Sequence, residues 1–154
     1  MLSTKAIENI QKAIDKYPRK RFASMDALMI AQEECGFLTE DVLREVANIL
    51  DIEPVQLNQV AAFYTMYNKK PVGKYHIQVC TNVTCSLLGA GHIAEFLSKK
   101  LGVKKGDTTP DKRFTLSEVE CLGSCGTAPM MQINDDYYEN LTEAKIEEIL
   151  KGLK

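Results

Sequence analysis

Four of the five cysteines in the chain fall into two pairs whose spacing could support metal chemistry. Cys80 and Cys85 form a C-x4-C pair, and Cys121 and Cys125 form a C-x3-C pair further along the chain. Thiolates are soft ligands that suit zinc, copper(I) or iron–sulfur clusters. In a reducing compartment, clustered cysteines are more often metal ligands or catalytic thiols than disulfides. We therefore expect these four sulfurs to hold one metal centre.

The spacing alone leaves more than one kind of thiol chemistry open. Structural zinc usually uses C-x2-C to C-x4-C knuckles, a range that includes both pairs, but we interpret these loops as suiting a [2Fe-2S] cluster in which each iron takes two sulfurs from one pair. Gly123 and Gly126 would let the backbone approach the sulfides, so that N–H groups hydrogen-bond to sulfur. A dithiol oxidoreductase is disfavoured because the chain contains no C-x-x-C sequence. An iron–sulfur cluster is the leading hypothesis, and a structural four-cysteine zinc domain that serves as an assembly adaptor is the alternative.

The other chemically active side chains are better explained as structural. His76 and His92 lie outside any repeated Cys-His pattern, which argues against Rieske-type ligation. Cys35 is interpreted as a small buried thiol at the end of a helix. The aromatic stretch Phe63–Tyr67 is interpreted as helix packing and an interface surface. Neither the Rossmann nor the P-loop fingerprint is present, because Gly89-Ala90-Gly91 lacks the full glycine pattern.

Residues 1 to about 70 show the pattern of four short helices joined by short loops, which predicts a small helical bundle. A break from Asn68 to Gly73 marks the domain boundary. We expect a bundle over residues 1–70 and a second domain over residues 74–154 that contains the four cysteines. The local signals in the bundle are helix ends at Pro18 and Gly36, an N-cap at Thr39, a first helical residue at Pro54, and a last helix that runs to about Met66 with Val55, Val60, Phe63, Tyr64 and Tyr67 available for packing.

The second domain reads as β-α-β-β-β-α, which predicts a four-stranded mixed sheet with helices against it and an α+β chain overall. The first two strands and the intervening helix form a βαβ unit, so the loops after these strands can emerge at one end of the sheet and bring the two cysteine pairs together. The predicted strands are Tyr75–Cys80, Phe114–Cys121, Met130–Ile133 and Tyr137–Glu139, and the predicted helices cover about residues 89–101 and the segment that Thr142 caps.

Composition and charge exclude several classes of partner. The chain has 154 residues, of which 45% are hydrophobic and 26% charged, as in an ordinary globular protein. A net charge of −2 with scattered Lys and Arg gives no footprint for nucleic acid. The sequence lacks the run of about 18 apolar residues that crosses a bilayer, and its N-terminus resembles neither a signal nor a transit peptide. We expect a cytoplasmic protein without direct membrane insertion.

Further segments accompany the cysteine framework and its Cys121–Cys125 core. They are Ala128–Met131, Ile133–Tyr138, Gly36–Leu38, Ala62–Met66 and Pro71–Tyr75. Together they resemble the NuoE-type subunit of respiratory complex I, a family that also supplies small subunits to NAD-linked and electron-bifurcating hydrogenases and formate dehydrogenases. The resemblance covers nearly the whole chain. One departure is Asp111-Lys112-Arg113, where the family commonly shows Asp-Gly.

The resemblance implies a helical bundle followed by a thioredoxin-like [2Fe-2S] domain, with Cys80, Cys85, Cys121 and Cys125 as the cluster ligands. It implies contact, supplied largely by the bundle, with a flavoprotein subunit that binds NADH and FMN, and assembly with further iron–sulfur subunits. The chain would then carry single electrons to and from that flavin without a substrate site of its own. A complex of this kind would hold the subunit peripherally on the inner face of the membrane. Which of the three kinds of complex it serves is left open.

Two acidic residues lie just before the second cysteine pair in sequence. Glu118 and Glu120 would disfavour added negative charge and lower the reduction potential if their side chains lie near the cluster.

Overall fold

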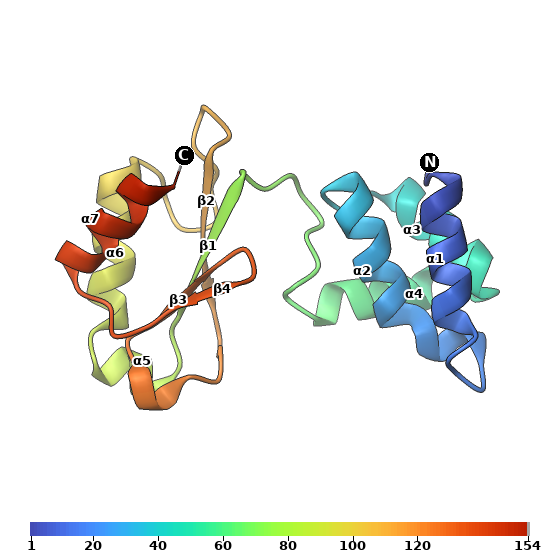
Figure 1. Cartoon of the computed structure of the whole chain (residues 1–154), viewed down its shortest axis with the longest axis horizontal. Coiled ribbons are helices and arrows are strands. Elements are labelled where there is room, and N and C mark those ends of the chain that lie inside the picture. The colour runs from blue at the N-terminus through green and yellow to red at the C-terminus, as the bar shows by residue number, and fades with distance from the viewer. Residues whose placement is uncertain (154) are drawn as a thin grey trace. The chain divides into compact units, whose positions relative to one another are not determined.

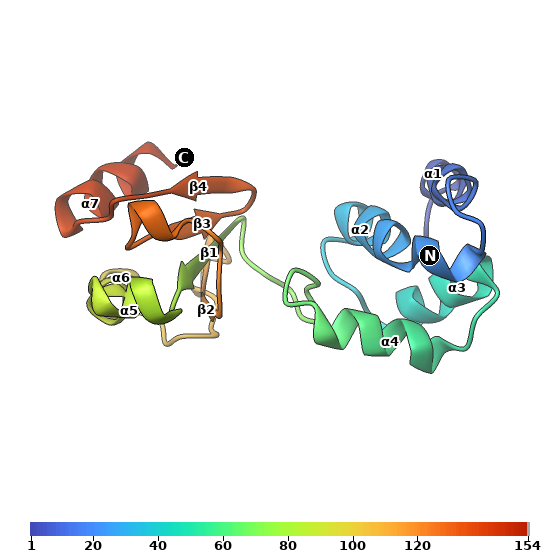
Figure 2. The same ribbon diagram turned by 90° about the horizontal axis from the view of Figure 1, so that it is seen from below.

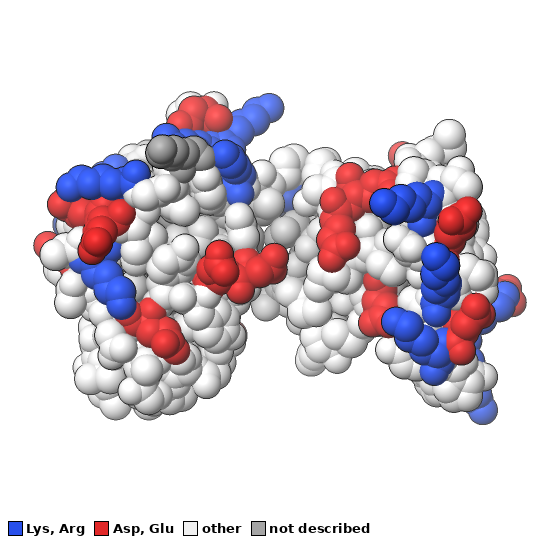
Figure 3. Space-filling model, in the orientation of Figure 1, with Lys and Arg blue, Asp and Glu red and all other residues white. Residues whose placement is uncertain are grey.

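The structure is a computed structural model that describes residues 1–153, and the chain divides into two compact units (Figure 1). The first unit comprises Met1–Pro71, and the second begins at Val72. Among the described residues, no helix combines the length and the apolarity that crossing a bilayer requires. Acidic and basic side chains are interspersed on the face shown in Figure 3.

The first unit is helical, and its helix ends follow the local sequence signals. The side chain of Thr39 accepts a hydrogen bond from the Val42 N–H, as predicted for an N-cap, and Pro54 opens the last helix. Gly36 ends the second helix as expected. The elements are α1 (Thr4–Ile14), the 3-10 helix η1 (Lys20–Ala23), α2 (Ser24–Cys35), α3 (Glu40–Leu50) and α4 (Pro54–Phe63), around a core that includes Ile10, Leu28, Leu38, Val46, Leu50 and Leu57.

Helix α4 ends three residues before the predicted Met66. Tyr64 leaves the helix with extended backbone, and the chain then turns so that Tyr67 is buried and donates its hydroxyl to the Met25 carbonyl at 3.0 Å. Three residues predicted to pack are instead exposed, Val55 at 60%, Phe63 at 77% and Tyr64 at 39%. The burial of Tyr67 explains why α4 ends at Phe63. A helix that continued to Met66 could not place the Tyr67 ring in the core.

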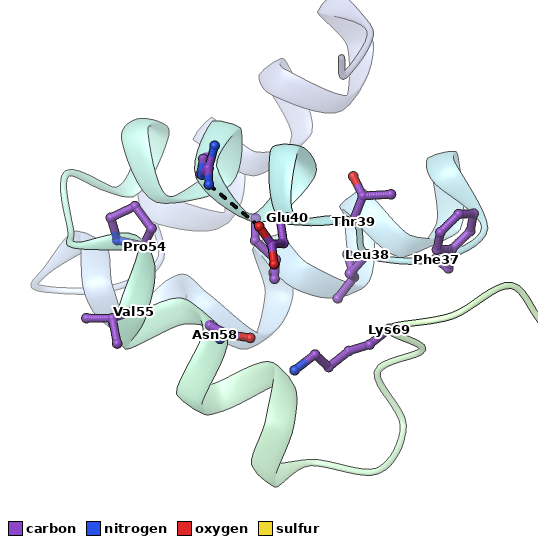
Figure 4. A pocket seen from close by; sticks show the side chains of 10 residues that line it. Phe37, Leu38, Thr39, Glu40, Pro54, Val55, Asn58 and Lys69 are labelled. Atoms are coloured by element: carbon purple, nitrogen blue, oxygen red, sulfur yellow. Dashed lines mark ion pairs between the residues drawn. The ribbon is translucent and has the colours of Figure 1, made fainter.

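An open groove of about 560 Å³ lies on the helical unit (Figure 4). It runs between the start of α3, the start of α4 and the segment at Lys69. An ion pair between Arg44 and Glu40, with 3.6 Å between nitrogen and oxygen, lies in its wall. None of the four paired cysteines lines it, so the thiol chemistry lies elsewhere.

The second unit is a four-stranded mixed sheet in the order β2-β1-β3-β4, which confirms the predicted sheet. Strand β1 pairs in parallel with β2, and β1 with β3 and β3 with β4 are antiparallel. Helix α5 is an element that the sequence did not predict. The bounds are β1 (Tyr75–Cys80), α5 (Val83–Leu87), α6 (Ala90–Leu101), β2 (Phe114–Val119), the 3-10 helix η2 (Cys125–Thr127), β3 (Met131–Ile133), β4 (Asp136–Tyr138) and α7 (Glu143–Gly152).

Helices α6 and α7 cover one face of this sheet (Figures 1 and 2). Side chains alternate along a strand, and the buried members of β1, Ile77 and Val79, face these helices. The other face carries polar side chains, including Gln78 and the residue paired with it, Gln132. In β4, Tyr137 pairs with Gln132 and therefore belongs to this polar face. The sheet thus has a packed face and a polar face.

The loop that departs from the family pattern has an unusual backbone. Lys112 lies in the left-handed region with φ of 56°, a conformation that glycine adopts most readily. The Asp111 carboxylate closes the turn, because it accepts hydrogen bonds from the Thr109 hydroxyl and the Arg113 N–H. These hydrogen bonds lower the pKa of Asp111. Lys112 therefore holds a backbone conformation that glycine would adopt more readily.

The entry into β1 depends on a close backbone crossing at Gly73. The Gly73 N–H donates to the Thr115 hydroxyl at 2.6 Å. A methyl group on Gly73 would lie 2.8 Å from the Phe114 carbonyl carbon and 2.9 Å from that of Arg113. Because those neighbours are backbone atoms, they cannot move aside cheaply.

We predict that Gly73→Ala lowers the free energy of unfolding by about 1–3 kcal/mol through this overlap. Gly91→Ala is the matched control, since Gly91 lies in α6 with nothing within 4 Å of the added methyl, and it should leave stability unchanged or raise it by up to about 1 kcal/mol. Urea denaturation followed by circular dichroism measures both. Equal stability of the two variants would contradict the crossing.

Candidate metal centre

The four paired cysteines lie at one end of the sheet. Cys80 is the last residue of β1, and Cys85 lies in α5. Cys121 follows β2 after one intervening residue, and Cys125 begins η2. Because β1 and β2 are parallel, with Cys80 opposite Val119, both loops leave the sheet in the same direction. The expected exit of the two loops at one end is confirmed.

The structure brings the thiols of all four cysteines together. The thiols of Cys85 and Cys121 lie close enough to Cys80 to lower its pKa. Cys85 in turn lies close enough to Cys80 and Cys125 for their charges to affect its ionisation. Within residues 1–153, no three histidine, cysteine or acidic side chains are arranged as ligands of a single metal ion. The four sulfurs form a chain of neighbours in which Cys80 lies near Cys85 and Cys121, and Cys85 lies near Cys125.

Backbone N–H groups lie near three of the four sulfurs. Those of Asn82 and Leu122 favour the ionised form of Cys80, and that of Met130 favours the ionised form of Cys85. The Gly123 N–H donates to the Cys121 sulfur, with 3.3 Å between nitrogen and sulfur. Gly123 has φ of +76°, a conformation that favours glycine and turns its N–H back toward Cys121.

The two buried thiols have pKa shifts of opposite sign. Burial is the largest influence on Cys80 and opposes its ionisation, but the N–H donors of Asn82 and Leu122 and the thiols of Cys85 and Cys121 outweigh it, so the pKa of Cys80 is lowered. Burial raises the pKa of Cys85, and donation of its S–H to Cys80 raises it further. Cys80 is therefore the thiol of this pair that ionises first.

The two pairs differ in exposure. Cys80 and Cys85 are buried at 3% and 2% exposure, whereas Cys121 and Cys125 are exposed. The site therefore has an inner pair, packed in the core of the sheet unit, and an outer pair at the surface.

A hydrogen-bonded network holds the outer loop against the end of β4. The Glu139 carboxylate accepts hydrogen bonds from the hydroxyls of Ser124 and Thr127, the latter at 2.7 Å. These hydroxyls lower the pKa of Glu139, so that it stays ionised as an acceptor. The Tyr137 hydroxyl donates to the Leu122 carbonyl at 2.7 Å on the other side of the loop. Side chains from one segment after β3 thus fix both ends of the loop.

Glu118 and His76, which lie outside the cysteine site, each interact with a side chain of their own. The Glu118 carboxylate forms an ion pair of 2.6 Å with Lys105, which offsets the charge expected to act on the second pair, while Glu120 is exposed. His76 hydrogen-bonds to the Ser117 hydroxyl at 2.9 Å, and burial lowers its pKa.

The two remaining candidate ligands are explained by structural contacts. His92 lies 2.7 Å from the Glu143 carboxylate. Cys35 is partly buried against the core of the helical unit. These contacts agree with structural roles for both residues.

The sequence did not predict helix α5 or the hydrogen bonds that Glu139 and Tyr137 form with the outer loop. The signal for α5 was present, because Asn82 is an N-cap residue type placed before Cys85, and its side chain accepts from the Val83 N–H at 2.8 Å. The contacts of Glu139 and Tyr137 with the loop had no comparable signal, since each joins segments at least 12 residues apart in sequence.

The donor set fits a thiolate-bound cluster. Four cysteine sulfurs supply the four thiolates that a [2Fe-2S] centre requires, and N–H groups already point at the sulfurs. The same four thiolates would also satisfy zinc by ligand type.

The chain matches a family model over most of its length. Residues 10–154 match the model described as thioredoxin-like [2Fe-2S] ferredoxin. A relative from Rhizobium meliloti, the second of its E-type NADH-quinone oxidoreductase subunits, is 48% identical over 96% of this chain and 88% of its own length. The E-type NADH-quinone oxidoreductase subunit of Rickettsia felis is 50% identical over 89% of this chain and 84% of its own.

Solved structures with the same fold come from a larger protein. The NAD+-reducing [NiFe]-hydrogenase in its H2-reduced state matches 82% of this chain with a TM-score of 0.70 and 21% identity, and its air-oxidised state matches 73% with a TM-score of 0.65 and 22% identity. The matched parts are 22% and 20% of those hydrogenase chains. At this identity the likeness shows the fold.

Proposed function

The chain belongs to the thioredoxin-like [2Fe-2S] ferredoxin family, and from this premise we propose that it is an electron-transfer subunit that carries one [2Fe-2S] cluster on Cys80, Cys85, Cys121 and Cys125. The observation that carries the proposal is the convergence of these four thiols, with N–H donors aimed at their sulfurs, in a chain about half identical to the E-type subunits of NADH-quinone oxidoreductases.

The residues of the site have distinct parts in this proposal. When bound, such a cluster takes up or gives up one electron at a time. Cys80 and Cys85 would hold one iron, and Cys121 and Cys125 the other. The N–H groups that point at the sulfurs favour added negative charge there, and burial of the inner pair keeps water from it. The exposed outer pair leaves the site open to a partner at the surface.

We propose that the partner is a flavoprotein subunit that binds NADH and FMN, exchanges single electrons with this site, and contacts the helical unit, with further iron–sulfur subunits in the same complex. The cofactors FMN and NAD(H) would be bound by that partner. The higher identity to the E-type subunits, 48–50%, against 21–22% for the hydrogenase, favours an NADH-quinone oxidoreductase as the parent complex. The subunit would then be cytoplasmic, held at the membrane only through its complex.

We predict that Cys121→Ser or Cys125→Ser disturbs the cluster, because serine replaces a soft sulfur ligand with oxygen. Visible absorption and EPR of the reduced protein should lose intensity by several-fold or change in shape. Cys35→Ser is the matched control, since that thiol belongs to the helical unit, and its spectra should equal those of the wild type. An unchanged cluster in both outer-pair variants would refute the ligand assignment.

For the partner, we expect the tagged chain to co-purify with a flavin-containing subunit and its cluster to be reduced when NADH is added anaerobically. Affinity purification with flavin analysis and EPR measures both. Reduction should disappear when the flavoprotein is stripped away, because this chain carries no nucleotide fingerprint. A chain that purifies without any flavoprotein and is not reduced by NADH in extract would contradict this partner.

A further inference from the structure

The peptide group between Leu122 and Gly123 links a tyrosine to the outer cysteine pair. We propose that Tyr137 is a positioning residue that acts through this peptide group to strengthen the hydrogen bond to the Cys121 sulfur and so raises the reduction potential of the centre. The inference rests on the proposed function, because it concerns the potential of the cluster proposed above.

Two hydrogen bonds share the peptide group. The Tyr137 hydroxyl donates to the Leu122 carbonyl with 2.7 Å between the oxygens, and the Gly123 N–H donates to the Cys121 sulfur at 3.3 Å. The Leu122 carbonyl and the Gly123 N–H are the two ends of one planar peptide unit. A donor at the carbonyl end withdraws electron density from the nitrogen end, and hydrogen bonds in such a chain polarise one another. The hydroxyl therefore makes the N–H a stronger donor to sulfur.

Core packing does not account for the position of Tyr137. Its side chain is 52% exposed and lies on the polar face of the sheet, opposite the face that α6 and α7 cover. The adjacent residue in the strand, Tyr138, lies on the covered face and packs against the core. What the Tyr137 side chain does contact is the cysteine loop, 15 residues earlier in the chain.

The direction of the effect follows from charge. Reduction adds negative charge to the centre, and an N–H directed at a ligand sulfur stabilises that charge, so a stronger donor raises the potential. Cys121 belongs to the exposed pair, whose ligand sulfurs are not enclosed by the core. Removal of the Tyr137 hydroxyl should therefore lower the potential while leaving the four thiols in place.

The test is a potentiometric titration of anaerobically purified Tyr137→Phe, followed by EPR. We expect wild-type cluster content and a more negative midpoint potential. Tyr138→Phe is the matched control, because it removes the same atom on the covered face, and its potential should equal that of the wild type. Amide hydrogen exchange at Gly123 supplies a second readout, which should be faster in Tyr137→Phe than in the control.

A second variant, in which the hydroxyl is strengthened instead of removed, tests the inference if Tyr137→Phe loses its cluster. Incorporation of 3-fluorotyrosine at position 137 makes the hydroxyl a stronger donor and should shift the potential upward. An unchanged potential in the 3-fluorotyrosine variant, or in Tyr137→Phe where that variant keeps its cluster, would overturn the inference. A wild-type protein without any [2Fe-2S] cluster would instead overturn the proposed function, and the tuning role with it.

Discussion

Parallel backbone pairing between β1 and β2, in register from Tyr75 opposite Phe114 to Cys80 opposite Val119, sends both cysteine loops out of one end of the sheet. Cys80 and Cys121 are 41 positions apart in sequence, yet this register brings their thiols close enough for Cys121 to lower the pKa of Cys80. A shift of one residue would turn Cys80 to the other face of the sheet. The close crossing of Gly73 over the start of β2 lies at the opposite end of the same strand pair. The chemistry of the site thus depends on strand pairing before it depends on any ligand.

The site also depends on backbone N–H groups that lie near the cysteine sulfurs. The inner pair lies near the N–H groups of Asn82, Leu122 and Met130, which favour the ionised thiols. The outer pair depends on a loop whose backbone is held by hydroxyls and a carboxylate, with Glu139 at one end. A centre with one enclosed and one exposed pair combines rigidity on the core side with access on the surface side. This difference suits a subunit that passes electrons to a partner.

Local patterns in the sequence were sufficient for the class of fold and for a four-stranded mixed sheet that begins with a βαβ unit. The period-two alternation of β1 and the N-caps at Thr39 and Thr142 are signals encoded within a few residues, and the structure confirms them. The end of α4 could not be predicted in this way, because it depends on the burial of Tyr67 against α2. The contacts of Glu139 and Tyr137 with the cysteine loop were also inaccessible, since they arise from tertiary proximity. Exposure of Phe63 and Val55 has the same origin, because helical spacing alone does not specify which stripe faces the core.

The most direct test of the cluster assignment is the metal and acid-labile sulfide content of the anaerobically purified full chain. Inductively coupled plasma analysis for iron and zinc, together with a sulfide assay, distinguishes the two centres that four thiolates can form. We expect about two irons and about two sulfides per chain, with zinc far below one, as the composition of a [2Fe-2S] cluster requires. About one zinc per chain without inorganic sulfide would contradict the assignment and would establish the structural zinc adaptor in its place.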